Sequence, residues 1–333
     1  MKSIFFIEGE EHIRFIEDYI YIAKKLNHKI SIYSFEKLKF KDKSVNLNLK
    51  TVKKENLRTI LKSLKSDYFF TTTPGVGSFY FPKSKNVKKY IYIFHSLCSP
   101  NEVYIKNSFL NFDFIFSPNQ IIANQLEFLV SESSKIFITG YPVLNHYKKE
   151  SDTNKDIILI APSWGKNSLL TDLVFLNNLI KQLRTNFEDK KIIIRPHPMQ
   201  LKLIESNQIF DSHMIKIDFD KNLNYLKNIS LLITDWSGIS LEYYSIDQGN
   251  IIFVDTPKKK RRNMKLKEKK YELIENKIRN IIGIIISKNT DFSKLDFNTK
   301  PISETDKKYL NDMFSPKFES KNIKKIILSL LNK

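Results

Sequence analysis

The sequence predicts an α/β protein made of two doubly wound units, each a parallel sheet with helices on both faces. Short apolar runs of strand length alternate with longer stretches whose apolar residues recur every three or four positions, a pattern typical of parallel βαβ units. A polar stretch at 145–156 interrupts this alternation, which then begins again. We therefore expect a first domain over 1–150 and a second over 151–302. A helical tail over 303–333 would pack back on the first domain.

In the first half, each element follows from a local pattern. The continuous apolar run at 2–7 is typical of a buried strand, and Ile13, Ile16, Ile20 and Ala23 are spaced as on one face of a helix over 11–26. The same reasoning predicts further strands and helices. The strands are 29–33, 67–72, 90–95, 112–117 and 135–139, and the helices are 56–64 and 121–130.

The second half repeats the architecture without repeating the sequence. Apolar runs predict the strands 157–160, 191–194, 213–217, 231–234 and 251–254. Helical spacing predicts 169–187, 223–226 and 239–246, followed by two helices near the end of the chain at 271–286 and 323–331.

Composition limits the function classes. The 55 basic and 36 acidic residues give a net charge of +19, which favours polyanionic partners such as phosphate-rich substrates or anionic lipid. A compositional bias unrelated to binding explains the charge equally well. The lone Cys98 excludes a disulfide framework and a cysteine-based zinc site. No run approaches the ~18–20 apolar residues of a membrane-spanning helix, so we expect a cytoplasmic protein with at most peripheral membrane contact.

Ligands of open parallel sheets bind beyond the carboxyl ends of the strands. Small, polar and histidine residues follow the expected strands of this chain, and they predict a site at those ends. They are 8–12, 72–77, 95–96, 140–142, 161–165, 195–198 and 234–238.

The segment from Thr234 to Ser240 joins an expected strand to an expected helix. Backbone N–H groups at a helix start attract anions, the small Ser237, Gly238 and Ser240 allow close approach, and the hydroxyls of Thr234 and Ser237 can donate to phosphate. Ordinary helix capping explains the same residues at least as well.

Two histidines follow expected strands. In Arg195-Pro196-His197-Pro198 the prolines hold a rigid turn that presents a guanidinium suited to phosphate and an imidazole suited to proton transfer. His95 ends a strand of the first half, where a general base would be placed to deprotonate a hydroxyl. A structural role is the alternative for each histidine.

Metal and polyanion sites have weaker support. Asp218 and Asp220 form a pair of carboxylates, but solvated loop residues are the simpler interpretation, so we expect no metal and no cofactor. A run of basic residues at 258–270 suits anionic lipid or a polyphosphate acceptor, with a solvated loop as the alternative; it begins Lys258, Lys259, Lys260, Arg261 and Arg262. Nucleic acid is not expected, because no motif for it occurs.

Together, these motifs resemble the CDP-glycerol:poly(glycerophosphate) glycerophosphotransferase family, whose enzymes build teichoic acids and related capsular polymers. The matching motifs are His95, Gly140-Tyr141-Pro142, Ala161-Pro162-Ser163-Trp164, Arg195-Pro196-His197-Pro198 and Thr234 to Tyr243. They span about residues 90–257, roughly half of the chain.

The resemblance implies a glycosyltransferase-B-like fold, in which two Rossmann-like domains face a central cleft, and a metal-independent transfer of an alditol phosphate from a CDP-activated donor. His95 and His197 match its two important histidines. On this basis the donor would contact Ser163, Arg195, Thr234, Asp235, Ser237, Gly238, Ser240 and Glu242. Glu10, Glu11 and His12 follow the first strand and would face a glycan or lipid-linked polymer acceptor.

The chain departs from the family pattern at two points. The family usually has Trp-His-Gly where this chain has Phe94-His95-Ser96, and a serine where it has Gly238. A CDP-ribitol or nucleotide-sugar donor therefore stays open. So do two other functions: a hexosyltransferase or UDP-sugar 2-epimerase of the same fold, and a non-catalytic polyanion-binding protein.

Overall fold

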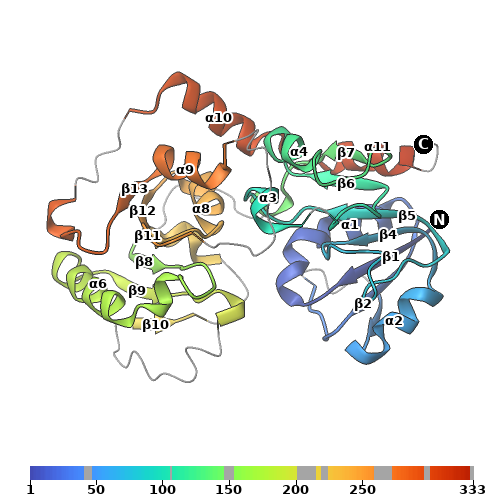
Figure 1. Cartoon of the computed structure of the whole chain (residues 1–333), viewed down its shortest axis with the longest axis horizontal. Helices are drawn as coiled ribbons and strands as arrows, with labels where there is room; N and C mark the ends of the chain where they lie inside the picture. Colours follow the sequence, from blue (N-terminus) through green and yellow to red (C-terminus); the bar gives the residue numbers. More distant parts are fainter. Residues whose placement is uncertain are drawn as a thin grey trace. The chain divides into compact units, whose positions relative to one another are not determined.

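The chain forms two compact units, each built on a parallel sheet (Figure 1). The computed structural model describes residues 1–40, 47–105, 107–145, 154–200, 215–218, 224–258, 272–295 and 301–330. The first unit comprises Met1–His146 and Lys308–Lys333, and the second comprises Tyr147–Lys307. The predicted α/β class with two parallel sheets is confirmed.

The sheet of the first unit has the order β3-β2-β1-β4-β5-β6-β7, and all its pairings are parallel. The strand order reverses its direction between β1 and β4, and ligands of such sheets bind beyond the carboxyl ends of the strands at the reversal. The strands are β1 (Lys2–Ile7), β2 (Lys29–Ser34), β3 (Asn48–Thr51), β4 (Lys65–Thr71), β5 (Asn86–Ile93), β6 (Phe114–Ser117) and β7 (Lys135–Ile138).

Helices in this unit cover the sheet and include the end of the chain. They are η1 (Glu10–His12), α1 (Ile13–Lys25), α2 (Lys54–Ser63), α3 (Pro100–Val103), α4 (Gln120–Leu126), α5 (Pro142–Asn145), α10 (Glu304–Phe314) and α11 (Ser320–Ser329). The boundary between the units falls within α10.

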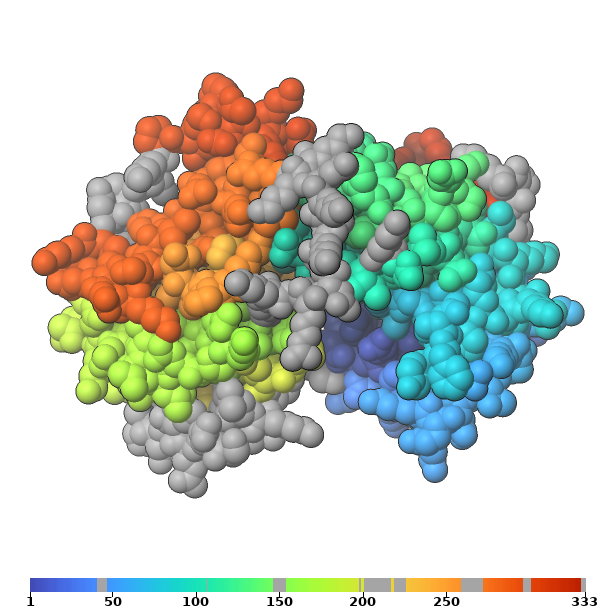
Figure 2. All heavy atoms as spheres, in the orientation of Figure 1, coloured from blue at the N-terminus to red at the C-terminus, as the bar shows by residue number. Residues whose placement is uncertain are grey.

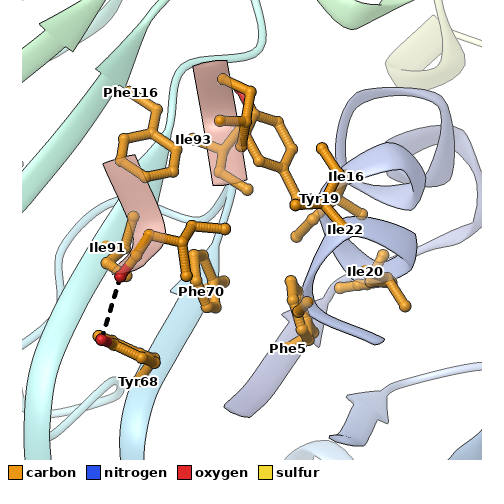
Figure 3. Close-up of a cluster of buried hydrophobic side chains, with 14 of the residues drawn as sticks. Phe5, Ile16, Tyr19, Ile20, Ile22, Tyr68, Phe70, Ile91, Ile93 and Phe116 are labelled. Atoms are coloured by element: carbon orange, nitrogen blue, oxygen red, sulfur yellow. Dashed lines mark hydrogen bonds between the residues drawn. The ribbon is translucent and has the colours of Figure 1, made fainter. Parts of the chain in front are cut away.

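An aromatic core joins α1, the central strands and α11. Figure 3 shows Tyr19 and its neighbours on α1 directed toward Phe70 and Phe116 on the strands. Phe5 stacks on Phe70 with ring centroids 4.7 Å apart. The Tyr68 hydroxyl donates to the Ile327 carbonyl of α11 at 3.2 Å, the bond drawn dashed in Figure 3. The chain end thus completes the core of the first unit.

The sheet of the second unit has the order β10-β9-β8-β11-β12-β13, again parallel throughout. Its winding reverses between β8 and β11. The strands are β8 (Ile157–Ile160), β9 (Lys191–Ile194), β10 (Ile215–Ile217), β11 (Ile229–Thr234), β12 (Asn250–Val254) and β13 (Ile284–Ile286).

The helical segments of this unit include α6, which packs its apolar face on the sheet. The outer side of α6 forms part of the yellow-green surface in Figure 2. They are η2 (Leu169–Thr171), α6 (Leu173–Asn186), η3 (Pro198–Gln200), η4 (Asn224–Asn228), α8 (Ile239–Asp247), α9 (Ile274–Ile282) and η5 (Phe292–Lys294).

The expected helix at 271–286 was wrong at its C-terminal end. The helix α9 stops at Ile282, and Ile284–Ile286 forms the edge strand β13 paired with β12. Gly283 has extended backbone geometry and ends the helix. The run of isoleucines on both sides of this glycine fits a helix or a strand, and pairing with β12 decided between them. The sequence patterns also missed β3, and within the expected helical tail at 303–333 they located α11 but not α10.

Candidate active site

In the first unit, two histidines meet at the carboxyl ends of the central strands. His12 lies in η1 after β1, and its Nδ1 is 2.9 Å from Oγ1 of Thr72, the residue after β4. His95 lies two residues past the end of β5, and its ring centroid is 5.1 Å from that of His12. Adjacent parallel strands therefore bring together residues that are far apart in the sequence.

Aromatic side chains surround His95. The ring centroid of Phe15 lies 5.5 Å from that of His95. The Tyr141 hydroxyl donates to the backbone carbonyl of His95 at 3.4 Å. Burial, with smaller contributions from the neighbouring His12 and Arg14, lowers the pKa of His95 to about 3, and the Ile93 backbone opposes the shift. His95 is therefore a neutral imidazole at physiological pH.

His12 is also held in its neutral form. Burial lowers its pKa, although the carboxylates of Glu11 and Glu8 oppose the shift. Nε2 of His12 lies 3.9 Å from Oε1 of Glu11. The backbone N–H of Glu10 donates to Glu36 at 2.6 Å, which ties the turn before α1 to the segment after β2. The residues predicted to face the acceptor are thus placed in one turn beside His95.

In the second unit, the carboxylate of Asp235 links two strand ends. It accepts the backbone N–H groups of Ser163 and Trp236, each at 2.6 Å, and that of Leu169 at 3.0 Å. Asp235 and Thr234 are both 0% exposed, and the Thr234 hydroxyl donates to the Ala161 carbonyl at 2.7 Å. In this arrangement Thr234 and Asp235 hold the loop after β8 against the start of α8, and their side-chain oxygens are engaged within the protein.

The start of α8 differs from an ordinary capped helix. Gly238 occupies the N-cap, and within the described residues no side chain caps the helix. The Ser240 hydroxyl donates to the Ser237 carbonyl at 3.0 Å. Glu242 lies in the first turn and is buried. Of the two interpretations of this segment, side-chain capping is not observed at the start of α8, and the anion site stays a prediction.

Arg195 follows β9 and forms an ion pair with Asp218. The Asp218 side chain is 5% exposed, so the interpretation of Asp218 as a solvated loop residue was wrong. Its backbone N–H bonds to the Ile194 carbonyl at 2.8 Å, because β10 pairs with β9 immediately before it. Asp220, the other member of the expected pair, lies outside the described residues.

The ring of His197 has a defined hydrogen-bonding state. The backbone N–H of Met199 donates to Nδ1 of His197 at 3.2 Å. Because Nδ1 accepts, the proton of the neutral ring is on Nε2. The ring centroid of Trp164 lies 6.1 Å from that of His197. His197 therefore presents an N–H donor beside the loop that Asp235 organises.

Comparison with known proteins decides the family. The model of the CDP-glycerol:poly(glycerophosphate) glycerophosphotransferase family matches residues 11–266. The chain belongs to this family. It is therefore a transferase that moves a glycerol phosphate unit from a CDP-activated donor to a polymer acceptor. No protein of curated function matches the chain by sequence.

Solved structures place this glycerophosphotransferase in the glycosyltransferase-B-like fold. A histidine-to-alanine variant of the wall teichoic acid polymerase TagF has a TM-score of 0.62 at 17% identity, covering 99% of this chain and 89% of that one. The UDP-GlcNAc 2-epimerase of Methanocaldococcus jannaschii, with UDP-GlcNAc and UDP, has a TM-score of 0.61 at 16% identity over 100% of both chains. The structure of S. aureus MnaA with UDP has a TM-score of 0.62 at 14% identity, covering 100% of this chain and 97% of that one.

One cation beside Trp236 in this glycerophosphotransferase escaped the sequence reasoning. Arg279 of α9 is 4% exposed, and its Cζ lies 3.8 Å from the ring centroid of Trp236. Its Nη2 pairs with Asp255 at 3.2 Å. The Lys258 ammonium is buried 5.3 Å from the same ring. The pairing of Trp236 with Arg279 has no signature in the sequence, because packing of α9 on the sheet brings these two residues together.

Other charged side chains of the glycerophosphotransferase bear on the predicted polyanion patch and on metal binding. The buried ammonium of Lys258 is not part of an exposed patch, and Lys259, Lys260, Arg261 and Arg262 lie outside the described residues. Across the residues that the structure describes, no group of three His, Cys, Asp or Glu side chains is arranged to hold a metal ion. No described helix is long and apolar enough to cross a membrane.

Proposed function

We propose that His95 is the general base of glycerol phosphate transfer and that Arg195 and His197 stabilise the leaving group. Nε2 of His95 takes the proton of the acceptor hydroxyl, and that oxygen forms a bond to the phosphorus that carries glycerol. The bond from this phosphorus to the bridging oxygen breaks, and its electron pair leaves with CMP. Charge on the transferring and leaving phosphates is the main feature to be stabilised in such a reaction.

The observation that carries this proposal is the neutral His95 beside His12 at the ends of β5 and β1. A buried imidazole is uncharged, and a general base must be uncharged before it can act. A diphosphate bound nearby would oppose the causes that lower the pKa of His95. Donor binding would thereby make His95 more basic when the acceptor hydroxyl is to be deprotonated.

His197 suits the complementary role. Its Nε2 carries a proton, because Nδ1 accepts from Met199. A donor N–H and the guanidinium of Arg195 are both suited to a phosphate oxygen. The partial burial of the Arg195–Asp218 ion pair limits how far the guanidinium can move. We infer that both side chains bind the phosphate that departs with CMP.

The donor pyrophosphate is proposed to lie at the start of α8. Ser237 and Gly238 would let it approach the backbone N–H groups of the first turn, with Ser240 and Glu242 in the same turn. Ser163 would contribute from the loop after β8. Thr234 and Asp235 are proposed to act through positioning, since their oxygens bond to backbone groups of that loop.

The acceptor is proposed to be a glycan or lipid-linked polymer that meets the turn containing Glu10, Glu11 and His12. We further propose that Lys259, Lys260, Arg261 and Arg262 dock the enzyme peripherally on an anionic membrane surface from the cytoplasmic side. Each basic residue near such a surface contributes roughly 1 kcal/mol. Lys258 is left out of this role, because its ammonium is buried beside Trp236.

Substitution of the two histidines tests the catalytic assignment. His95→Ala and His197→Ala should each lower kcat for CMP release from CDP-glycerol by about 100-fold or more, because acid–base groups commonly contribute that much. His28→Asn is the matched control. Nδ1 of His28 lies 2.8 Å from the Ser3 hydroxyl at the amino ends of β1 and β2, whereas the site lies at the carboxyl ends. Circular dichroism checks folding. Near-normal turnover of both alanine variants would reject the assignment.

A panel of donors tests substrate choice. The enzyme should release CMP from CDP-glycerol only when a glycerol phosphate polymer is present. Conversion of UDP-GlcNAc to another sugar without an acceptor would identify an epimerase instead.

Cosedimentation with phosphatidylglycerol vesicles tests the membrane role. Neutralising Lys259–Arg262 should reduce the bound fraction, whereas four Lys→Gln changes at the exposed Lys53, Lys54, Lys62 and Lys83 serve as the charge-matched control. Equal loss of binding in both variants would remove the specific role of the segment.

A further inference from the structure

A short hydrogen-bond chain ends on His95. The Tyr92 hydroxyl lies 3.3 Å from Nδ1 of His95. The same hydroxyl donates to the Tyr104 hydroxyl at 3.1 Å. Tyr92 belongs to β5 and is 0% exposed, and Tyr104 follows α3 and is 7% exposed. Neither tyrosine belongs to a motif that the sequence singled out.

The protons in this series of hydrogen bonds can be counted. A tyrosine hydroxyl has one proton and can donate only one hydrogen bond. Tyr92 uses its proton on Tyr104, so its oxygen can only accept from His95. Burial raises the pKa of Tyr92 well above its ordinary value, and Tyr104 and Glu8 raise it further, so Tyr92 keeps this proton. The hydrogen on the His95 side must then come from Nδ1.

We propose that Tyr104 and Tyr92 are positioning residues that fix the tautomer of His95, with the proton on Nδ1 and the lone pair on Nε2. Nε2 is the atom that would take the acceptor proton, so this inference rests on the proposed function and deepens it. The order matters: Tyr104 fixes the direction of the Tyr92 hydroxyl, and Tyr92 then fixes the imidazole. Tyr104 would thus act on the base without touching it.

The aromatic packing keeps these rings in place independently of their hydroxyls. The Tyr92 ring lies 4.7 Å from Phe109 and 5.2 Å from Phe112, and the Tyr104 ring lies 4.9 Å from Phe109. Edge contacts of this kind hold a phenylalanine as well as a tyrosine. Tyr→Phe variants therefore remove the hydrogen bonds while they retain the packing.

The two important histidines would then have opposite tautomers. Nδ1 of His197 accepts from a backbone N–H, whereas Nδ1 of His95 donates to a tyrosine oxygen. One ring offers a lone pair on Nε2 and the other offers an N–H at the same position. This difference matches the separate roles of base and donor, which environments rather than residue type assign.

Nuclear magnetic resonance of enzyme labelled with ¹⁵N-histidine tests the tautomer directly. The unmodified enzyme should show a protonated Nδ1 for His95, with the signals assigned by their loss in His95→Gln. In Tyr104→Phe the freed Tyr92 proton should turn to Nδ1, and the proton of His95 should move to Nε2. A protonated Nε2 in the unmodified enzyme, or an unchanged tautomer in Tyr104→Phe, would overturn the proposal.

Turnover provides the second readout. Tyr104→Phe and Tyr92→Phe should lower kcat by about 10- to 100-fold, within the contribution of a general base, with little change in KM for CDP-glycerol. Tyr19→Phe is the control, because it loses a buried hydrogen bond to Thr139 in the same unit but has no link to His95. A changed tautomer with unchanged kcat would support the relay and would instead reject His95 as the base.

Discussion

The carboxylate of Asp235 accepts the backbone N–H of Ser163 at 2.6 Å, joining residues 72 positions apart in the chain. Ser163 follows β8 and Asp235 follows β11, the two strands between which the second sheet reverses its winding. Two further backbone N–H groups, of Trp236 and Leu169, bond to the same carboxylate. A single buried acid thus sets the shape of the loop proposed to contact the donor.

Replacement of this acid should destabilise the enzyme. In Asp235→Asn one carboxylate oxygen becomes an NH₂ group that cannot accept from a backbone N–H. A buried donor left without its partner costs about 1–3 kcal/mol, and more when the partner was charged. Urea unfolding followed by circular dichroism should show this loss, whereas Asp312→Asn at an exposed position should not. Equal stability of the two variants would contradict the role given to Asp235.

The low pKa of His95 should appear in the pH dependence of stability. The pKa is about 3 in the folded enzyme and near its ordinary value of 6.5 in the unfolded chain. Between these values the unfolded chain binds a proton that the folded enzyme does not, so the free energy of unfolding falls as pH drops below about 6.5. His95→Gln cannot titrate and should lose less stability between pH 7 and pH 4.5. Parallel urea-stability curves for both proteins would exclude the depressed pKa.

Gly140 should be required for docking of the chain end. Its φ is +77°, and a Cβ there would lie 2.3 Å from the backbone nitrogen of Phe318. Gly75 has φ +82° but open space around a Cβ, so Gly75→Ala reports only the backbone cost, about 1–3 kcal/mol. Gly140→Ala should cost more and should speed amide hydrogen exchange in α11. An equal loss of stability at the two glycines would show that the backbone at Phe318 can move to accommodate the added Cβ, and would contradict the prediction.

Two substitutions at His197 should separate its ring nitrogens. Gln places an amide N–H near the position of Nε2, whereas Asn replaces only the Nδ1 side. If the Nε2 proton serves the leaving phosphate, His197→Gln should retain about 10-fold more kcat than His197→Asn, the worth of roughly one hydrogen bond to a charged group. The measurement is CMP release at saturating CDP-glycerol. The reverse order would assign the function to Nδ1.

Much of the candidate site could be predicted from the sequence, because its residues directly follow expected strands. His95, His197 and the segment after β11 follow apolar runs, and the residues after parallel strands of one sheet meet at its carboxyl edge. The partners of these residues were not visible. Tyr92 lies inside an apolar run, and Tyr104 reaches Tyr92 from the segment after α3, so neither tyrosine had a spacing that linked it to His95. Asp218 looked like a solvated acid because its partner is on the neighbouring strand.

The α/β class, the order of most strands and helices, and the family could be predicted from the sequence, since apolar periodicity and the spacing of motifs are local properties. Which side chains touch depended on how the elements pack. Packing of β1, β4 and β5 side by side put His12, Thr72 and His95 together. The same packing buried His95 and so set its charge, because the cost of removing an imidazolium from water depends on everything around the ring.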